Sequence, residues 1–238
     1  MSESGRSPKG TGSRPRPRWD PFRFDRRRLV AAGAPEGVLA GADEAGRGCL
    51  AGPLVAAAVS LDYGRSRYRE LAGLTDSKLL QRARREELYL LLLSEARRIS
   101  IAVVSPRTID DVGLHRSNLN ALIAAIQGLD GTYALALVDG FDVRRPDLRA
   151  EQLVGGDAKS AAVAAASVVA KVTRDRLMRG LDALHPAYGF CEHVGYATRR
   201  HRQALLDHGP SVLHRRSFAG VDDAQLALWD RGQEGGAR

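Results

Sequence analysis

The sequence has little cysteine and no long hydrophobic run, and each shortage excludes a class of protein. Cys49 and Cys191, the two cysteines in 238 residues, cannot build a disulfide framework. No apolar stretch approaches the roughly 18 residues that a membrane-spanning helix needs, and the N-terminus carries no visible secretory signal. We therefore expect free thiols in a reducing compartment, which favours the cytoplasm, and we expect no association with a membrane.

The length and composition fit one large domain, or one domain with an appendage. The formal net charge of +8 is unevenly spread, because residues 1–28 carry nine basic and three acidic residues, a net +6. This segment is also rich in Ser, Gly and Pro, so we expect a basic disordered tail over residues 1–28 and folded structure from about Leu29. Such a tail fits non-specific binding to a polyanion and fits a solubilising extension equally well.

An acidic pair, Asp43 and Glu44, follows an apolar run that predicts a buried strand. Neighbours in a strand point to opposite faces, so both acids can serve one site only if the chain bends, and Gly46 and Gly48 suit such a bend. Bare backbone N–H groups and the Arg47 guanidinium beside two carboxylates suit a hard cation and a phosphate held together. An acidic turn at a strand end is the alternative.

Two further acids stand in similar settings. Asp139 ends another buried apolar run, and Asp157 precedes an alanine-rich helix expected over residues 158–181. Ligand sites of α/β sheets collect at strand ends, although Asp139 alone could be a turn residue and Asp157 alone a helix cap. Together the four acids could hold two divalent cations, which would activate a water and stabilise the departing oxygen in phosphodiester hydrolysis.

Hydrophobic periodicity predicts the remaining regular elements. The expected strands cover residues 53–61, 99–104 and 133–138, and the expected helices cover residues 79–98, a segment from 106, 115–128 and 198–208. Asp76 or Ser77 is expected to cap the helix over 79–98, with Lys78 projecting from its first turn.

A loop with glycines and a proline is expected over residues 185–196. Its tyrosines, Tyr188 and Tyr196, could stack on a sugar or a base. Four nearby side chains are potential zinc ligands, but their spacing matches no compact zinc pattern: Cys191, His193, His201 and His208. Residues 214–218 form a basic cluster.

Short segments in a fixed order carry a resemblance to a known family. They are residues 43–48, 76–78, 137–140, 156–157, 164–175, 185–190, 195–196 and 214–218. Together they resemble the ribonuclease HII family, over roughly residues 38 to 218. The sister family, ribonuclease HIII, usually has lysine at the position of Arg47 and a folded N-terminal domain, so ribonuclease HII is preferred.

The resemblance implies an α/β, ribonuclease H-like fold: a central mixed five-stranded sheet flanked by helices, with a helical C-terminal extension. The catalytic domain would cover residues 29–218, followed by a short helix and polar tail over 219–238. The implied enzyme is a monomeric endoribonuclease that uses two Mn²⁺ or Mg²⁺ ions. It would hydrolyse the RNA strand of RNA–DNA hybrids and incise 5′ to single ribonucleotides in duplex DNA, leaving a 3′-hydroxyl and a 5′-phosphate. A non-catalytic nucleic-acid-binding protein on the same fold is the alternative.

The resemblance also implies roles for individual residues. The catalytic and metal-binding acids of the family match Asp43, Glu44, Asp139 and Asp157. The implied substrate-binding residues are Gly46, Arg47 and Gly48, which would read the 2′-hydroxyl, Tyr196, which would pack on the adjoining deoxyribose, and Ser77 and Lys78. Val194 and Gly155 stand where the family often has lysine, so phosphate contacts there would be weaker or would come from Lys159 or Arg199.

Overall fold

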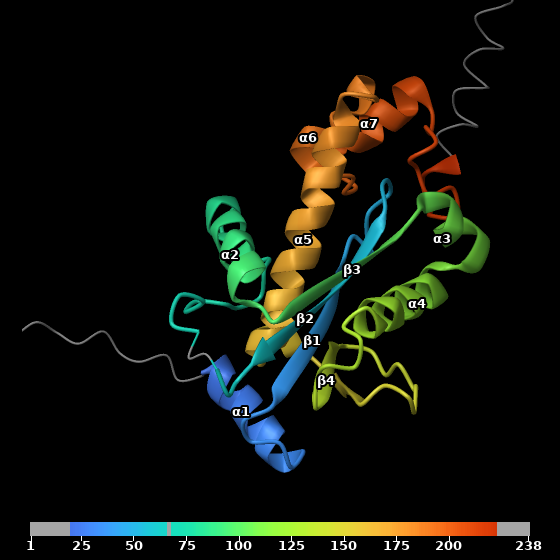
Figure 1. Cartoon of the computed structure of the whole chain (residues 1–238). Helices are drawn as coiled ribbons and strands as arrows, with labels where there is room; N and C mark the ends of the chain where they lie inside the picture. Colours follow the sequence, from blue (N-terminus) through green and yellow to red (C-terminus); the bar gives the residue numbers. More distant parts are fainter. Residues whose placement is uncertain (1–19, 66–67, 223–238) are drawn as a thin grey trace, which may run out of the picture.

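A computed structural model of the chain describes residues 20–65 and 68–222, in which a five-stranded sheet carries helices on both faces (Figure 1). The strands are β1 (Val38–Ala45), β2 (Leu54–Asp62), β3 (Arg98–Val104), β4 (Leu135–Asp139) and β5 (Ala150–Leu153). Their order is β3-β2-β1-β4-β5. Strands β1, β2 and β3 pair antiparallel, whereas β1, β4 and β5 pair parallel, so the predicted mixed five-stranded sheet is confirmed.

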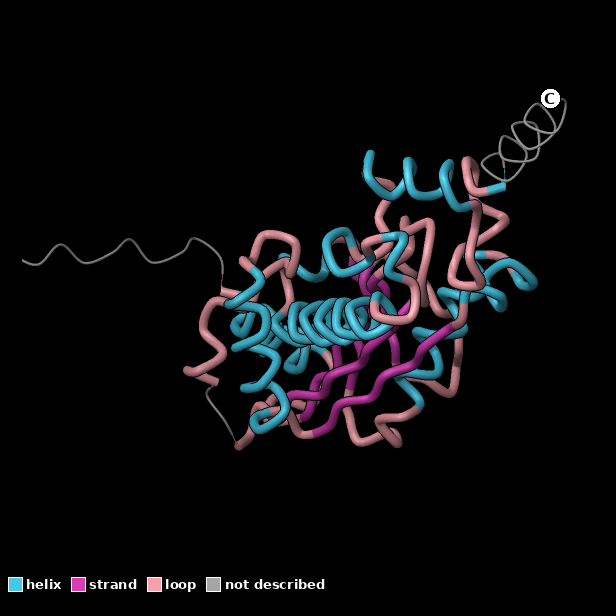
Figure 2. The backbone as a smooth tube through the Cα atoms, turned by 90° about the horizontal axis from the view of Figure 1, so that it is seen from above, coloured by secondary structure: helices cyan, strands magenta, loops and turns pink. Residues whose placement is uncertain are grey.

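Each face of the sheet is covered by its own group of helices. The long helix α5 (Ala161–Asp182) crosses one face together with α1 (Pro21–Ala31) and α2 (Arg82–Glu95). Helices α3 (Pro106–Val112) and α4 (Leu114–Gln127) cover the other face. Figure 2 shows α5 lying beside the strands when the molecule is seen from above.

The contact between α5 and β1 is unusually close because β1 has a glycine at the crossing point. A Cβ on Gly41 would lie 2.1 Å from the carbonyl carbon of Ala162 and 2.2 Å from the backbone nitrogen of Val163. Only a residue without a side chain lets the helix backbone pack directly on the strand. This packing sets the distance between the start of α5 and the end of β1.

Helix α1 shows that folded structure begins before Leu29, so the predicted boundary of the tail is wrong for residues 21–28. The side chain of Asp25 is fully buried and accepts hydrogen bonds from the Tyr63 hydroxyl (2.5 Å) and the Ala162 backbone N–H (3.0 Å). Burial raises the pKa of Asp25 to about 6, against hydrogen bonds that lower it. The rest of the predicted tail, residues 1–19, lies outside the described residues.

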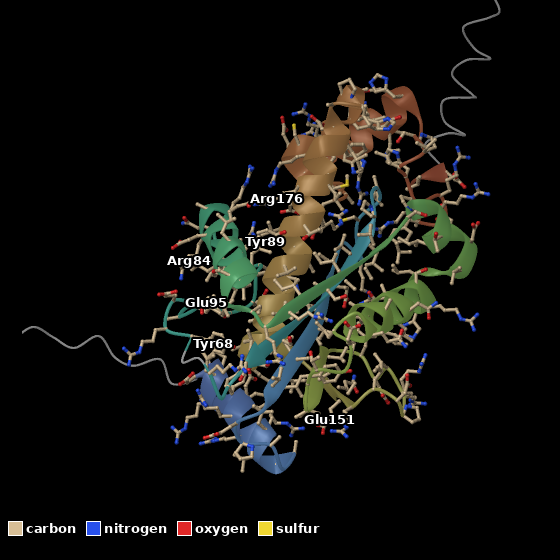
Figure 3. The ribbon with its side chains drawn as sticks, viewed as in Figure 1. Tyr68, Arg84, Tyr89, Glu95, Glu151 and Arg176 are labelled. Carbon is tan, nitrogen blue, oxygen red and sulfur yellow. The ribbon has the colours of Figure 1, made fainter. Side chains whose placement is uncertain are left out.

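Helix α2 begins later than expected, at Arg82, and its N-cap residue Gln81 makes no side-chain capping bond. The predicted cap at Asp76 or Ser77 is wrong: the Asp76 carboxylate accepts from the Lys78 N–H (2.8 Å) and stabilises a separate turn. Farther along, α2 packs on α5 through Arg176, whose guanidinium carbon lies 4.5 Å from the Tyr89 ring centroid (Figure 3).

The C-terminal part packs on the far end of α5 and contains two short helices. These are α6 (Phe190–His193) and α7 (Arg199–His208), preceded by the 3-10 turn η2 (Pro186–Tyr188). The predicted helix over 198–208 is thus confirmed. Tyr188 is buried and donates its hydroxyl to the Gly209 carbonyl (2.8 Å), so its predicted stacking on a nucleotide is wrong. Most of the short helix and polar tail predicted over residues 219–238 lies outside the described residues, which end at 222.

Every described helix is too short or too polar to cross a bilayer.

Candidate active site

Three carboxylates meet at one edge of the sheet. Strands β1 and β4 run parallel with Ala42 opposite Val138, so Asp43 and Asp139 leave the sheet at the same end. Asp157 comes from the 3-10 turn η1 (Gly156–Ala158) just before α5. One carboxylate oxygen from each of the three aspartates lies within 4.8 Å of the other two.

Backbone contacts hold this arrangement in place. The Gly156 N–H donates to the Asp139 carboxylate at 2.6 Å and draws η1 against the end of β4. Ser160 caps α5 by accepting from the Val163 N–H, so the alternative role of Asp157 as the cap of that helix is wrong. The carboxylate of Asp157 is thereby left for the site.

Glu44 lies apart from the three aspartates because β1 does not bend where a bend was expected. Glu44 pairs regularly with Ala56, and the turn at Gly46 (φ +95°) follows both acids. Ser167 of α5 lies against the Asp43 carboxylate, whereas Asn118 of α4 lies against the Glu44 carboxylate. The two side chains therefore face different sides of the sheet, as strand alternation requires.

Burial gives the acidic residues unusual electrostatics. Burial, and then the charges of Glu44 and Asp139, raises the pKa of Asp43 to about 8. Burial raises the pKa of Glu44 to about 7, and burial followed by the Asp139 charge raises that of Asp157. Desolvated carboxylates that repel one another suit a hard divalent cation, which would supply the missing positive charge. Within residues 20–65 and 68–222, the one group of three potential metal ligands consists of Asp43, Asp139 and Asp157.

A lysine and a serine flank the aspartates. Lys78 is exposed, and although partial burial lowers its pKa, the carboxylates of Asp76 and Asp157 raise it above the ordinary value. Ser77 is buried, and its hydroxyl oxygen lies 2.9 Å from that of Ser167. Ser77 is therefore placed behind Asp43, where it orients Ser167, and Lys78 is placed at the surface, where a phosphate can reach it.

The segment over residues 46–48 forms a turn next to the acids, in which Gly46 is buried, Arg47 is half-buried and Gly48 is exposed. A Cβ on Gly46 would lie 2.0 Å from Nε of Arg174, whereas a Cβ on Gly48 would meet nothing within 4 Å. The Arg47 guanidinium carbon lies 4.9 Å from the Phe141 ring centroid, and its Nε lies 3.8 Å from the Glu44 carboxylate. The turn thus presents open backbone at Gly48 beside a stacked, partly exposed guanidinium.

Two buried arginines donate hydrogen bonds to the backbone of this turn and of the segments around it. Arg174 donates to three backbone carbonyls, those of Ala51, Pro53 and Val194. Arg215 donates to the carbonyls of Gly52 and Arg47. Both side chains are fully buried, and burial lowers the pKa of Arg215 to about 10. Within the basic cluster over 214–218, Arg215 is thus buried and binds backbone carbonyls.

Tyr196 lies beyond the turn, with 40% of its surface exposed. Its ring centroid is 5.0 Å from Nζ of Lys171. Val194 is buried in a left-handed conformation (φ +45°), and Gly155 also has positive φ (+63°). Arg199 is exposed at the first residue of α7.

Comparison with known proteins places this site in a family. The family model described as Ribonuclease HII matches residues 40–221. The chain is 50% identical to the Ribonuclease HII of Xanthobacter autotrophicus over 211 residues, which is 89% of this chain and 82% of that protein. The chain belongs to the ribonuclease HII family.

Solved structures of related enzymes have the same fold. The ribonuclease H2 of Pyrococcus horikoshii OT3 aligns with a TM-score of 0.72 and 26% identity, over 81% of this chain and 99% of that one. The RNase HII of Archaeoglobus fulgidus, solved in complex with PCNA, aligns with a TM-score of 0.64 and 31% identity, over 76% and 95% of the two chains. This ribonuclease HII is thus a hydrolase of the ribonuclease H type, an endoribonuclease that acts on nucleic acid.

Sequence reasoning missed the polar residues that support the acids of this ribonuclease HII. Asn118 is fully buried beside Glu44, and both its amide atoms lack a hydrogen-bond partner. Its signal was a polar residue on the apolar face of α4, between Ala121 and Leu114 in helical spacing. Ser167 is the corresponding polar residue on the buried face of α5.

Proposed function

We propose that this ribonuclease HII hydrolyses the RNA strand of RNA–DNA hybrids and incises 5′ to single ribonucleotides embedded in duplex DNA, leaving a 3′-hydroxyl and a 5′-phosphate. The observation that carries the proposal is the convergence of Asp43, Asp139 and Asp157 within 4.8 Å, beside a turn at residues 46–48 that is exposed at Gly48. A carboxylate cluster that holds divalent cations can take the scissile phosphate, and the open backbone beside it can contact the sugar next to that phosphate.

The cofactor in this proposal is Mg²⁺ or Mn²⁺, with two ions present during catalysis. Divalent metal would be held by Asp43, Asp139 and Asp157. Glu44 would be the fourth ligand, because it is close enough to the site for the Asp139 charge to raise its pKa, as that charge also does for Asp43. Bound divalent ions activate a water and stabilise the departing oxygen of a phosphodiester. The protein's own contribution is to hold unsolvated carboxylates in place, with Ser167 orienting Asp43.

Substrate selection in this proposal depends on the turn over residues 46–48. The 2′-hydroxyl distinguishes RNA from DNA, and the accessible backbone at Gly48 can contact it without a side chain in the way. Tyr196 would pack on the adjoining deoxyribose with its exposed ring. The Arg47 guanidinium and the Lys78 ammonium carry positive charge for the phosphates on either side.

An incision assay tests the proposal. The substrate is duplex DNA containing one ribonucleotide, with Mg²⁺ or Mn²⁺, and a long RNA–DNA hybrid is run in parallel. We expect Asp43→Asn and Asp139→Asn to abolish cleavage while substrate binding is largely retained, and Arg47→Ala to weaken binding at the ribonucleotide. Asp142→Asn, an exposed acid near Asp139, is the matched control.

Two outcomes would contradict the proposal. One is intact substrate with both ions. The other is binding that is independent of metal, steeply dependent on salt and never followed by product, which is the behaviour of a non-catalytic nucleic-acid-binding protein.

The cellular setting completes the proposal: a monomer that acts in the cytoplasm, in ribonucleotide excision repair and DNA replication. Cys49 and Cys191 are unpaired, which suits a reducing compartment. Light scattering after gel filtration tests the monomeric state, and a mass near twice 25.7 kDa would contradict it.

A further inference from the structure

Three histidines pack against one another directly behind Tyr196. His193 ends α6, His201 lies in the first turn of α7, and His214 follows α7, and all three are buried. The His193 and His201 rings stack with centroids 4.4 Å apart, and the His201 and His214 centroids are 5.2 Å apart. Nothing in the proposed chemistry uses these imidazoles, so their arrangement needs its own explanation.

The partners of His201 and His214 fix the position of every ring proton. A carbonyl oxygen can only accept, so Nδ1 of His201, 2.9 Å from the Tyr196 carbonyl, carries the hydrogen. The Nε2 of a neutral His201 is then an acceptor, and Nε2 of His214, 3.0 Å away, must donate to it. Nδ1 of His214 is left to accept from the Ser211 N–H at 2.9 Å.

His193 follows the same logic with different partners. Its Nε2 lies 2.9 Å from the Tyr188 carbonyl and must donate, so its Nδ1 accepts the Gly195 N–H at 3.2 Å. All hydrogen bonds of the three rings are therefore satisfied only when each ring is neutral and in one tautomer. We call this set of three rings the histidine network.

The histidine network holds a turn that contacts both the substrate-facing tyrosine and the segment after Gly48. His201 binds the Tyr196 carbonyl, which also accepts from the Thr198 N–H at 2.8 Å. The next carbonyl back, that of Gly195, accepts from the Leu50 N–H at 3.0 Å. A Cβ on Gly195 would lie 2.3 Å from the Ala51 carbonyl oxygen, so the two segments are in direct backbone contact.

We propose that His201 and His214 are positioning residues, which hold the backbone of Gly195 and Tyr196 against the segment that follows the 46–48 turn and so maintain the preference for a ribonucleotide junction over plain DNA. The proposal rests on the function proposed above for Tyr196 and the turn. It adds that this preference requires a neutral histidine network.

The surroundings favour neutral rings. Burial, together with the neighbouring imidazoles, lowers the pKa of His201 to about 4 and that of His214 to about 3. The other titratable groups that face the network are Tyr188, whose ring centroid lies 4.8 Å from that of His214, and His185, which also lowers the pKa of His214. A proton added at Nε2 of His201 would face the N–H of His214 and break the bond between them.

Two substitutions at His201 separate its hydrogen bonds from its volume. His201→Phe keeps an aromatic ring beside Phe190 and His193 but removes both hydrogen bonds. His201→Asn places an amide N–H near the position of Nδ1, so it can still donate to the Tyr196 carbonyl. His208→Gln, an exposed change at the other end of α7, is the control.

The measured quantity is the ratio of dissociation constants for an all-DNA duplex and the same duplex with one ribonucleotide, determined in EDTA. We expect His201→Phe to reduce this ratio roughly fivefold to tenfold, the value of one neutral hydrogen bond. For His201→Asn this ratio should stay within about twofold of that of the unchanged protein, because the hydrogen bond to the Tyr196 carbonyl is kept. An unchanged ratio in a folded His201→Phe protein would overturn the proposal, whereas no preference in the unchanged protein would instead overturn the proposed reading of the junction.

Nitrogen NMR of the unchanged protein provides a second test that does not depend on substrate or on a variant that folds. Long-range ¹H–¹⁵N correlation at pH 7 should show His201 with its proton on Nδ1, and His193 and His214 with theirs on Nε2. A charged His201, or one with its proton on Nε2, would overturn the network.

Discussion

Asp43→Asn is expected to stabilise the metal-free protein while it destroys the site. Asp43 is 6% exposed and has an ordinary carboxyl pKa of 3.8, which burial and the neighbouring acids raise to about 8 in the folded protein. Between those values the folded state binds more protons than the unfolded state, so the free energy of unfolding falls as pH rises from about 4 to about 8. Asparagine has no charge to bury and removes this loss.

The size of the effect follows from the pKa difference. Each pKa unit is worth about 1.4 kcal/mol, so at pH 7 the buried carboxyl costs up to roughly 4 kcal/mol. Asparagine can still accept the Glu44 N–H that now binds Asp43 at 2.7 Å, so little is lost in exchange. We expect a gain of about 2–4 kcal/mol, which for a chain of this size is a rise in Tm of roughly 5–15 °C.

Thermal unfolding followed by circular dichroism in EDTA, from pH 5 to pH 9, measures this effect. The Tm of the variant should exceed that of the unchanged protein by a margin that grows with pH. Added Mn²⁺ should raise the Tm of the unchanged protein only. Asp142→Asn is the control, because the Arg144 side chain lowers the pKa of that exposed acid and its loss brings no gain. An Asp43→Asn protein no more stable than the original at pH 8 would refute the electrostatic reasoning.

Three further predictions follow from the packing, the substrate path and the histidine network. Gly41→Ala should lower the free energy of unfolding by about 3 kcal/mol or more in urea, because its Cβ would meet the α5 backbone at 2.1 Å, whereas Gly180→Ala, with open space around it, should not. Val194→Lys should steepen the dependence of log affinity on log salt by about 0.9 for one added phosphate contact, and an unchanged slope would place the phosphates elsewhere. The stability advantage of the unchanged protein over His201→Phe should shrink as pH falls from 6.5 toward 4, because the unfolded histidine takes up a proton before the folded one does; a constant advantage would contradict the pKa of His201 near 4.

The sequence predicts much of the fold because buried elements have strong periodicity. Strands β2 and β4 are near-continuous apolar runs, and α4 and α5 carry wide apolar faces. Strand β5 has the sequence AEQL on the sheet edge and offers no such run. Helix α1 was hidden for a related reason, since only Asp25 and Leu29 of its arginine-rich sequence are fully buried.

The candidate site shows the same division. The meeting of Asp43 with Asp139 follows from the ends of two neighbouring strands, which the apolar runs in the sequence predict, whereas Asp157 is brought to them by the turn η1 before α5. The position of Glu44 depends on where the chain bends, and the sequence does not show that Gly46 turns only after both acids. The sequence does not show that Arg215 is buried, because its carbonyl partners, Arg47 and Gly52, are distant in sequence.

Manganese binding, followed by electron paramagnetic resonance without nucleic acid, most directly tests whether Asp43, Asp139 and Asp157 form one cation site. The account predicts that Asp139→Asn and Asp157→Asn each weaken the tightest manganese binding at least tenfold, about 1.4 kcal/mol, while Asp142→Asn leaves it unchanged. Equal affinity in the unchanged protein and both site variants would contradict it.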